Sequence, residues 1–219
     1  ALDDTDSTEG MCTTYLTCLI LRKFKEINLI ADIPNLVRLN PNIPYKTRGN
    51  GACWFHIDDN NLSGERKKEI KTIVLDLLKK YSRFEDENTN PACVFLDDEN
   101  FKINFEILNK FYKKAVSELC TIEEADEISG KINATAYKFK NGRGIVGCLA
   151  CLGCDFSDLT YELLIYRTEE NFGKERMIDE ESVFEMHKLL YPGTYDNVNE
   201  EEHKLVFMPH GKDPILCGI

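Results

Sequence analysis

Short apolar stretches of strand type alternate with amphipathic helical stretches along the whole sequence, and this alternation constrains the fold more than any other feature. Strand patterns end at Leu2 or fall at 36–39, 52–57, 92–96, 134–139, 160–167, 204–208 and 215–219. Helical patterns fall at 13–27, 63–81, 104–119, 121–129, 144–153 and 180–191. Such mixtures build domains in which helices cover a sheet. We therefore predict an α/β (α+β) protein.

The same pattern suggests two domains, which we place at 1–120 and 121–219. The second half has the strand and helix alternation of a small α+β sandwich of ferredoxin type. Two helix starts carry capping signals: Thr13 or Thr14 suits the first N-cap, and Asp179 precedes the last helix. Ser63-Gly64 opens the second helix.

Composition excludes several classes of protein. The longest apolar runs, at 145–152 and 161–166, are far shorter than the roughly 20 residues that span a bilayer. A net charge of −11 opposes non-specific binding to nucleic acid, and we expect no DNA partner. The nine cysteines are an odd number and lie mostly in apolar stretches, which indicates buried thiols in a reducing cytoplasm.

A cluster of three carboxylates follows the first strand. Asp3, Asp4 and Asp6 lie within four residues, and their mutual repulsion favours a cation between them. Magnesium prefers hard oxygen ligands such as carboxylates, and it is often bound by carboxylates and nucleotide phosphates together. The alternative is a solvated acidic turn that caps the next helix.

Two further segments have the chemistry of phosphate binding. Residues 7–14 place hydroxyls, including those of Thr13 and Thr14, at a helix N-terminus, where free N–H groups and the helix dipole favour an anion. Residues 46–51 combine cations with small residues that let the backbone approach a phosphate; the candidates there are Lys46, Arg48, Gly49 and Asn50. Asn50-Gly51 is also a common hairpin turn, which remains the alternative.

Residues 142–147 match the pattern G-x-G-x-x-G before a helix. The preceding strand is polar, so we do not interpret the match as a dinucleotide site. Arg143 and Gly144 remain candidates to bind a phosphate or a base. The cysteines at 148, 151 and 154 imitate an iron–sulfur pattern, but the first two lie on an apolar helix and are expected to be packing residues.

Two loops rich in amides, hydroxyls and aromatic rings, 88–91 and 191–197, suit recognition of a base or a small amine. Ordinary turn chemistry explains them equally well.

Several long strings, taken together, resemble the archaeal tRNA-isoleucine agmatidine synthases, the TiaS family. In order they are LDDTDS (2–7), GMCTTYL (10–16), LVRLNPNIPYKTRGNGA (36–52), TNP (89–91), GRGIVG (142–147) and YPGTYDNV (191–198). The resemblance covers nearly the whole chain. It implies the family's kinase-like domain over 1–120 and its ferredoxin-like domain over 121–219, without the OB-fold and zinc ribbon that follow in the family.

The resemblance also implies an activity, namely ATP- and Mg²⁺-dependent attachment of agmatine to C2 of the wobble cytidine of an isoleucine tRNA. AMP and pyrophosphate are released, and the modified tRNA reads AUA. Asp3, Asp4 and Asp6 would then hold Mg²⁺ and ATP, and Thr13, or else Thr14, would accept a phosphate. Tyr191, Tyr195 and Asp196 are the expected agmatine contacts.

Two other functions stay open on the residues alone. One is a non-catalytic RNA-binding module that uses a patch of Arg38, Lys46, Arg48 and Arg143. The other is a kinase that acts on a small amine without RNA.

Overall fold

The computed structural model describes residues 1–47, 49–58, 62–157, 163–166, 180–192, 198–199, 204–205 and 215–218. The chain divides into two compact units, one of residues 1–7 and 11–155 and the other of residues 8–10 and 156–219. No helix in the described part of the chain is both long and apolar enough to cross a membrane.

A five-stranded antiparallel sheet forms the centre of the first unit, in the order β2-β3-β1-β4-β5. Its strands are β1 (Leu2–Asp3), β2 (Asn35–Arg38), β3 (Gly51–Trp54), β4 (Ala92–Phe95) and β5 (Thr135–Lys138). In the register, Leu2 lies opposite both Cys53 and Cys93. The short β1 is therefore central, and the residues that follow it leave from the middle of the sheet.

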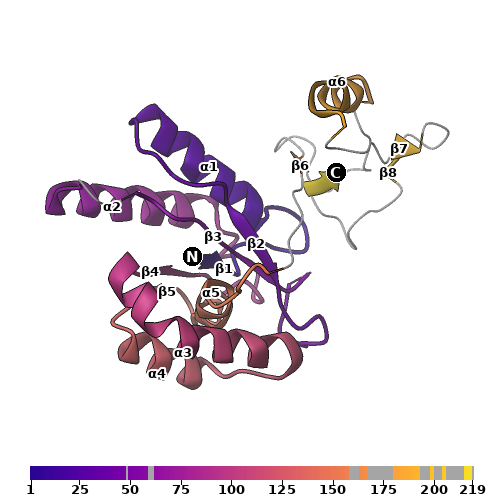
Figure 1. Cartoon of the computed structure of the whole chain (residues 1–219). Coiled ribbons are helices and arrows are strands. Elements are labelled where there is room, and N and C mark those ends of the chain that lie inside the picture. The colour runs from indigo at the N-terminus through magenta and orange to yellow at the C-terminus, as the bar shows by residue number, and fades with distance from the viewer. Residues whose placement is uncertain are drawn as a thin grey trace. The chain divides into compact units, whose positions relative to one another are not determined.

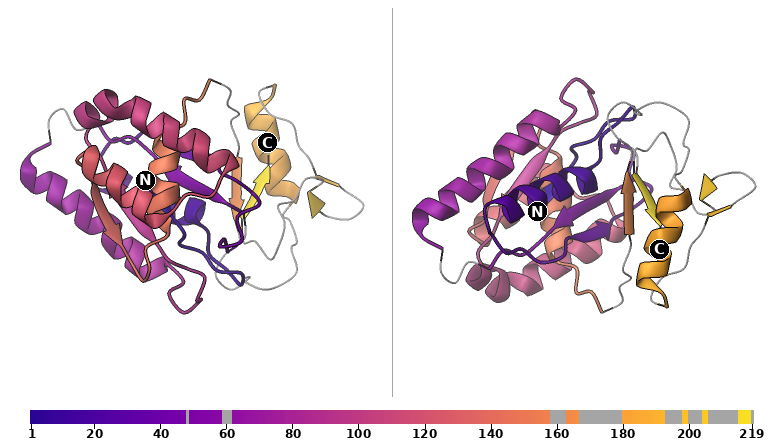
Figure 2. Two further views of the ribbon diagram at one scale, coloured as in Figure 1. Left: turned by 90° about the horizontal axis from the view of Figure 1, so that it is seen from below. Right: turned by 90° about the horizontal axis from the view of Figure 1, so that it is seen from above.

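Helices cover both faces of this sheet (Figure 1). The helices α1 (Thr13–Glu26) and α2 (Gly64–Tyr81) lie on one face. The other face carries α3 (Asp98–Ser117), α4 (Ile122–Lys131) and α5 (Gly144–Leu152). Views from below and above show the two groups in turn (Figure 2).

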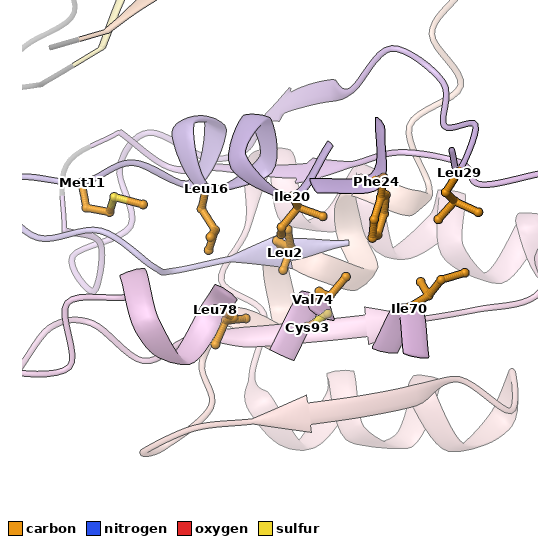
Figure 3. Close-up of a cluster of buried hydrophobic side chains, with 10 residues drawn as sticks. All are labelled: Leu2, Met11, Leu16, Ile20, Phe24, Leu29, Ile70, Val74, Leu78 and Cys93. Carbon is orange, nitrogen blue, oxygen red and sulfur yellow. The ribbon is translucent and has the colours of Figure 1, made fainter. Parts of the chain in front are cut away.

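The apolar spacing of α1 and α2 explains the first of the two packed layers. One face of each helix meets the sheet in a cluster of ten buried residues: Leu2, Met11, Leu16, Ile20, Phe24, Leu29, Ile70, Val74, Leu78 and Cys93 (Figure 3). On the opposite face, α5 is apolar all round and packs against α3, β3 and β4. A helix that is hydrophobic on all sides is buried, as this one is.

The second unit contains two small antiparallel pairs and one helix among its described residues. Strand β6 (Leu163–Tyr166) pairs with β9 (Ile215–Gly218), and β7 (Val198–Asn199) pairs with β8 (Lys204–Leu205). Its helix is α6 (Glu180–Leu190). The strand β7 was not among our expectations, and the predicted cap Asp179 lies outside the described residues.

The predicted mixed α/β class is confirmed, with differences at the ends of elements. The N-cap of α1 is Cys12, without a side-chain capping bond, and Thr13 is the first helical residue. Helix α3 begins at Asp98 rather than near 104, because Asp97 caps it by accepting a hydrogen bond from the backbone N–H of Asn100. Strand β5, which we assigned to the second half, pairs with β4 in the first sheet, and α5, also assigned to the second half, packs on that sheet; the first unit ends after Asp155 rather than near 120.

Candidate functional site

The segment that leaves the middle of the sheet carries the candidate carboxylates. Asp4 directly follows β1, has a left-handed backbone (φ 59°) and is 9% exposed. The carboxylate of Asp3 accepts a hydrogen bond from the backbone N–H of Asp4 at 2.7 Å. Aspartate is among the few residue types that adopt left-handed conformations readily. The left-handed backbone at Asp4 and the hydrogen bond to Asp3 therefore fix how these two carboxylates are oriented at the end of β1.

Four segments that are far apart in the sequence meet at Asp4. The Arg143 guanidinium binds Asp4 Oδ2 through Nε at 3.0 Å and Nη2 at 2.8 Å. Nη2 also donates to the backbone carbonyl of Asn88 at 2.6 Å. The Thr47 hydroxyl lies 3.5 Å from both Asp4 Oδ1 and the Asn88 carbonyl. The acidic loop, the 46–51 loop, the 88–91 loop and the start of α5 are thus brought together as one site.

The glycines of the 142–147 motif let α5 approach β1. A Cβ on Gly144 would lie 2.7 Å from both the Asp3 carbonyl oxygen and Ala92 N, and one on Gly147 would lie 1.9 Å from Asp3 Oδ2. Gly142 has φ +72° in the turn before the helix. The motif therefore supports close packing of the helix on the strand, which is how Arg143 reaches Asp4.

Burial dominates the electrostatics of the two carboxylates. Burial raises the pKa of Asp4 from 3.8 to about 6, although the charge and hydrogen bonds of Arg143 lower it. Burial, and then the negative charges of Asp4 and Asp6, raise the pKa of Asp3 well above its ordinary value. Desolvation favours the neutral form of an acid, and so does a neighbouring negative charge. Both carboxyl groups are therefore protonated more readily than an exposed aspartate, and the Arg143 charge offsets part of this effect at Asp4.

Asp3, Asp4 and Asp6, the residues predicted to hold magnesium, are not gathered around one point in the structure. Among the described residues, no group of three or more His, Cys, Asp or Glu side chains is placed to hold a metal ion. Asp4 is paired with Arg143, and the Asp3 carboxylate is directed at Gly147 of α5. These residues do not fit a metal site made of three protein carboxylates.

Hydroxyl groups gather at the N-terminus of α1, as the sequence indicated. Thr13 is 6% exposed, and its hydroxyl lies 3.0 Å from that of Thr5, directly after Asp4. The Thr14 hydroxyl instead lies 3.0 Å from Cys12 Sγ. The two threonines therefore have different surroundings, and Thr13 is the one joined to the acidic loop.

Side chains of the 46–51 loop donate hydrogen bonds to backbone carbonyls of the preceding residues 40–43. The Lys46 ammonium donates to the carbonyls of Pro41 (2.5 Å) and Ile43 (3.1 Å). The Asn50 amide donates to the Asn40 carbonyl at 2.9 Å. A side chain at Gly49 would come within 3.0 Å of Arg38 Nη1. Arg48 lies outside the described residues, and Thr47 is the loop residue seen to contact Asp4.

The remaining candidates lie in the second unit or on α5. Tyr191 is 70% exposed, and Tyr195 and Asp196 lie outside the described residues. Cys148 and Cys151 are fully buried on α5, as expected for packing residues. A cavity of about 540 Å³ opens beside the start of β1, between residues such as Leu2 and Trp54, and Asp4 is not in its wall.

The sequence interpretation missed three residues. Thr47 was passed over between two cations, although a hydroxyl between Lys46 and Arg48 is itself a phosphate-type signal. Thr5 was passed over between aspartates. Asn88 contributes its backbone carbonyl, which no side-chain pattern can reveal; its loop was noted only for its amides.

Comparison with known proteins assigns the whole chain to one family. The family model of the TiaS TCKD domain matches residues 1–141, and that of the TiaS FLD domain matches residues 142–219. A curated relative from Pyrococcus horikoshii, the isoleucine-tRNA 2-agmatinylcytidine synthetase TiaS, is 48% identical over this entire chain and 50% of its own length. The relative of the same name from Methanocaldococcus jannaschii is 43% identical over the entire chain and 51% of its length.

Solved structures agree. The complex of TiaS with its isoleucine tRNA and ATP superposes with a TM-score of 0.77 at 40% identity, covering 99% of this chain and 51% of the other. The complex of TiaS with the same tRNA, AMPCPP and agmatine gives a TM-score of 0.75 at 38% identity, covering 99% and 52%. The chain spans about half the length of the curated relatives it matches. With both family models matched and this similarity along its full length, the chain belongs to the TiaS family of isoleucine-tRNA 2-agmatinylcytidine synthetases.

Proposed function

We propose that this chain carries the ATP-dependent centre of an RNA-modifying ligase that attaches agmatine to C2 of the wobble cytidine of an isoleucine tRNA. The products are agmatidine, AMP and pyrophosphate. The observation that carries the proposal is the meeting of the acidic loop, the 46–51 loop, the 88–91 loop and Arg143 at Asp4. The relatives' names and the complexes solved with ATP, agmatine and the isoleucine tRNA support it.

In this proposal the N-terminal part is a kinase-like ATP-binding domain and the C-terminal part is a ferredoxin-like domain. The residues assigned to ATP are Asp6, Thr14, Lys46, Arg48, Gly49 and Asn50. Asp3 and Asp4 organise the centre, and in a separate self-phosphorylation the Thr13 hydroxyl accepts the γ-phosphate of an ATP, which leaves as ADP. The proximity of Thr13 to Thr5 supports Thr13 over Thr14, because it ties that hydroxyl to the segment that carries Asp4.

Magnesium belongs to this proposal as a companion of the nucleotide. Mg²⁺ is usually held by one or two carboxylates together with substrate phosphates and water, and it neutralises phosphate charge. The absence of a three-carboxylate cage among the described residues is compatible with that arrangement. The role of the protein is then to present Asp4 at the end of β1 in a fixed orientation.

The substrate side of the proposal rests on the C-terminal half. Arg143 and Gly144 at the start of α5, and Tyr191, Tyr195 and Asp196 further on, are the residues assigned to agmatine and the cytidine. Carboxylates and aromatic faces suit agmatine, which is cationic at both ends. A cytoplasmic location, where tRNA is modified, follows from the same proposal.

The structure disfavours the alternative of a simple RNA-binding patch. That patch requires Arg38, Lys46, Arg48 and Arg143 to face a phosphate backbone. The Lys46 ammonium donates to the backbone carbonyls of Pro41 and Ile43, and Arg143 is paired with Asp4. Two of the four cations are therefore engaged inside the protein.

The first test is ATP binding by isothermal titration calorimetry in Mg²⁺. Asp4→Asn should weaken binding at least about tenfold, the usual scale for removing a ligand-orienting carboxylate. The matched control is Glu106→Gln, which removes one charge from the exposed surface of α3. Equal binding by Asp4→Asn and the control would refute the role of Asp4.

The second test follows the products. The chain is incubated with ATP, Mg²⁺ and labelled agmatine, with and without the isoleucine tRNA, and label is sought in the RNA. Label in RNA supports the ligase, whereas a phosphorylated amine formed without RNA identifies the small-amine kinase. With γ-labelled ATP, peptide mapping of residues 10–22 should find phosphate on Thr13.

A further inference from the structure

Arg143 stands out because it joins two parts of the sequence that family models separate. It lies in the stretch matched by the TiaS FLD domain, residues 142–219, yet its guanidinium binds Asp4, in the stretch matched by the TCKD domain. Both residues belong to the same compact unit of the structure. A carboxylate in the stretch of the first family domain is therefore paired with a guanidinium in the stretch of the second.

The backbone around Arg143 is fixed from both sides. Its N–H donates to Asn141 Oδ1 at 2.9 Å, and the N–H of Gly144 donates to the Asn90 carbonyl at 3.0 Å. Behind it, α5 is buried along its length. Little conformational freedom is left to lose when the guanidinium engages Asp4, which is the condition for a preorganised contact.

The guanidinium binds one face of the carboxylate. Nε donates to Oδ2, and Nη2 lies 2.8 Å from the same oxygen while it donates to the Asn88 carbonyl. Oδ1 lies on the side of Thr47, in the loop proposed for phosphates. With side-chain exposures of 20% for Arg143 and 8% for Asp4, the pair is largely removed from water. Arg143 thus fixes the orientation of the Asp4 carboxylate, with one oxygen on the guanidinium and the other directed toward Thr47.

We infer that Arg143 is a positioning residue for ATP use, which orients the Asp4 carboxylate and makes the nucleotide site a joint product of the two family domains. This inference rests on the proposed function, since it concerns the same site. It assigns Arg143 no contact with ATP: the guanidinium acts on ATP binding through Asp4.

The test compares ATP binding by the whole chain and three variants, Arg143→Gln, Arg143→Lys and Lys140→Gln. Lys140→Gln is a matched control. The Lys140 ammonium donates to the carbonyls of Phe84 and Asp86, just before the 88–91 loop in the sequence, and does not contact Asp4. Arg143→Gln and Lys140→Gln each remove one positive charge, so a general effect of net charge on the ATP anion is the same in both.

We expect Arg143→Gln to bind ATP about 10–100-fold more weakly, the usual range for a residue that orients a ligand-binding side chain. Arg143→Lys should recover part of the loss, since an ammonium keeps the charge but not the two-nitrogen geometry. Lys140→Gln should bind as the wild type does. Circular dichroism and thermal unfolding verify that each variant is folded.

A double-mutant cycle with Asp4→Asn separates positioning from direct contact with phosphate, with ATP titrated into the millimolar range. If Arg143 acts through Asp4, adding Arg143→Gln to Asp4→Asn should change affinity by less than about twofold. Equal binding by Arg143→Gln and Lys140→Gln would overturn the inference, and so would a full loss that persists in the Asp4→Asn background. Failure of the wild-type chain to bind ATP would instead refute the proposed function itself.

Discussion

Gly147→Ala tests the packing that holds the candidate site together. An alanine Cβ at this position would lie 1.9 Å from Asp3 Oδ2 and 2.6 Å from its Cγ. Non-bonded heavy atoms normally approach to roughly 3.5 Å, so the overlap exceeds about 1 Å. Either α5 moves away from β1, or the carboxylate turns and loses its hydrogen bond from the N–H of Asp4.

The size of the effect follows from opposing terms. Overpacking a well-packed core costs about 1–3 kcal/mol, and losing a hydrogen bond costs about 0.5–1.5 kcal/mol. Replacing glycine by alanine inside a helix returns about 1 kcal/mol. Movement of α5 would relieve the overpacking, and rotation of the Asp3 carboxylate would do so by giving up the hydrogen bond, so the two costs do not add in full. We expect a net destabilisation of about 2 kcal/mol.

Gly130→Ala is the matched control, because Gly130 lies in α4 and no atom lies within 4 Å of the added Cβ. It should stabilise the protein by about 0.5–1 kcal/mol. Urea unfolding followed by the fluorescence of Trp54, the single tryptophan of the sequence, reports on the unit that contains both sites. A Gly147→Ala variant as stable as Gly130→Ala would refute the proposed close contact between α5 and Asp3.

Three further predictions concern stability and thiol chemistry. Because the pKa of Asp4 is about 6 when folded and 3.8 as an ordinary aspartate, the folded state binds more protons between these values. In EDTA, this stabilisation is complete below about pH 4, and roughly 3 kcal/mol of it is lost by about pH 7; Asp4→Asn should flatten that part of the pH profile, and an unchanged profile would contradict the assignment. Thr121→Ala removes the capping box with Glu124 and should cost about 1 kcal/mol in urea unfolding, whereas no loss would mean that the cap is dispensable. A maleimide should label the partly exposed thiols of Cys12, Cys18, Cys120 and Cys154 before the buried thiols of Cys53, Cys93, Cys148 and Cys151. Exposure separates the two sets, because burial raises the pKa of Cys18 and Cys120 as well as those of the buried thiols; early labelling of Cys148 would argue against its packing role.

Local signals were sufficient for most helices and strands. Ser63 caps α2 where the sequence placed the start of that helix, and α2 ends at Tyr81 as its apolar period indicated. Helix α3 began earlier than predicted because its first turn is stabilised by the Asp97 cap rather than by buried apolar residues. Apolar periodicity indicates the buried face of a helix, so it does not detect a first turn that is polar and exposed.

The candidate site was predicted in parts but not in its connections. Asp4 and Arg143 were both selected from their own short segments, and nothing in either segment shows that they pair across 139 positions. The assignment of magnesium to the three aspartates stays a prediction; in the structure the carboxylates of Asp3 and Asp4 face different neighbours, Gly147 and Arg143.

The sequence by itself determined the alternation of strands and helices, the acidic loop after β1, the phosphate-type chemistry of the 46–51 loop and the family. These depend on residue type, period and spacing, which are local properties. Only the tertiary structure decided that α5 packs on β1, that Gly144 and Gly147 make room for it, and that Arg143 binds Asp4 and Asn88. The physical reason is that antiparallel pairing places β1 at the centre of the sheet, and close packing there joins groups whose separation along the chain carries no local signal.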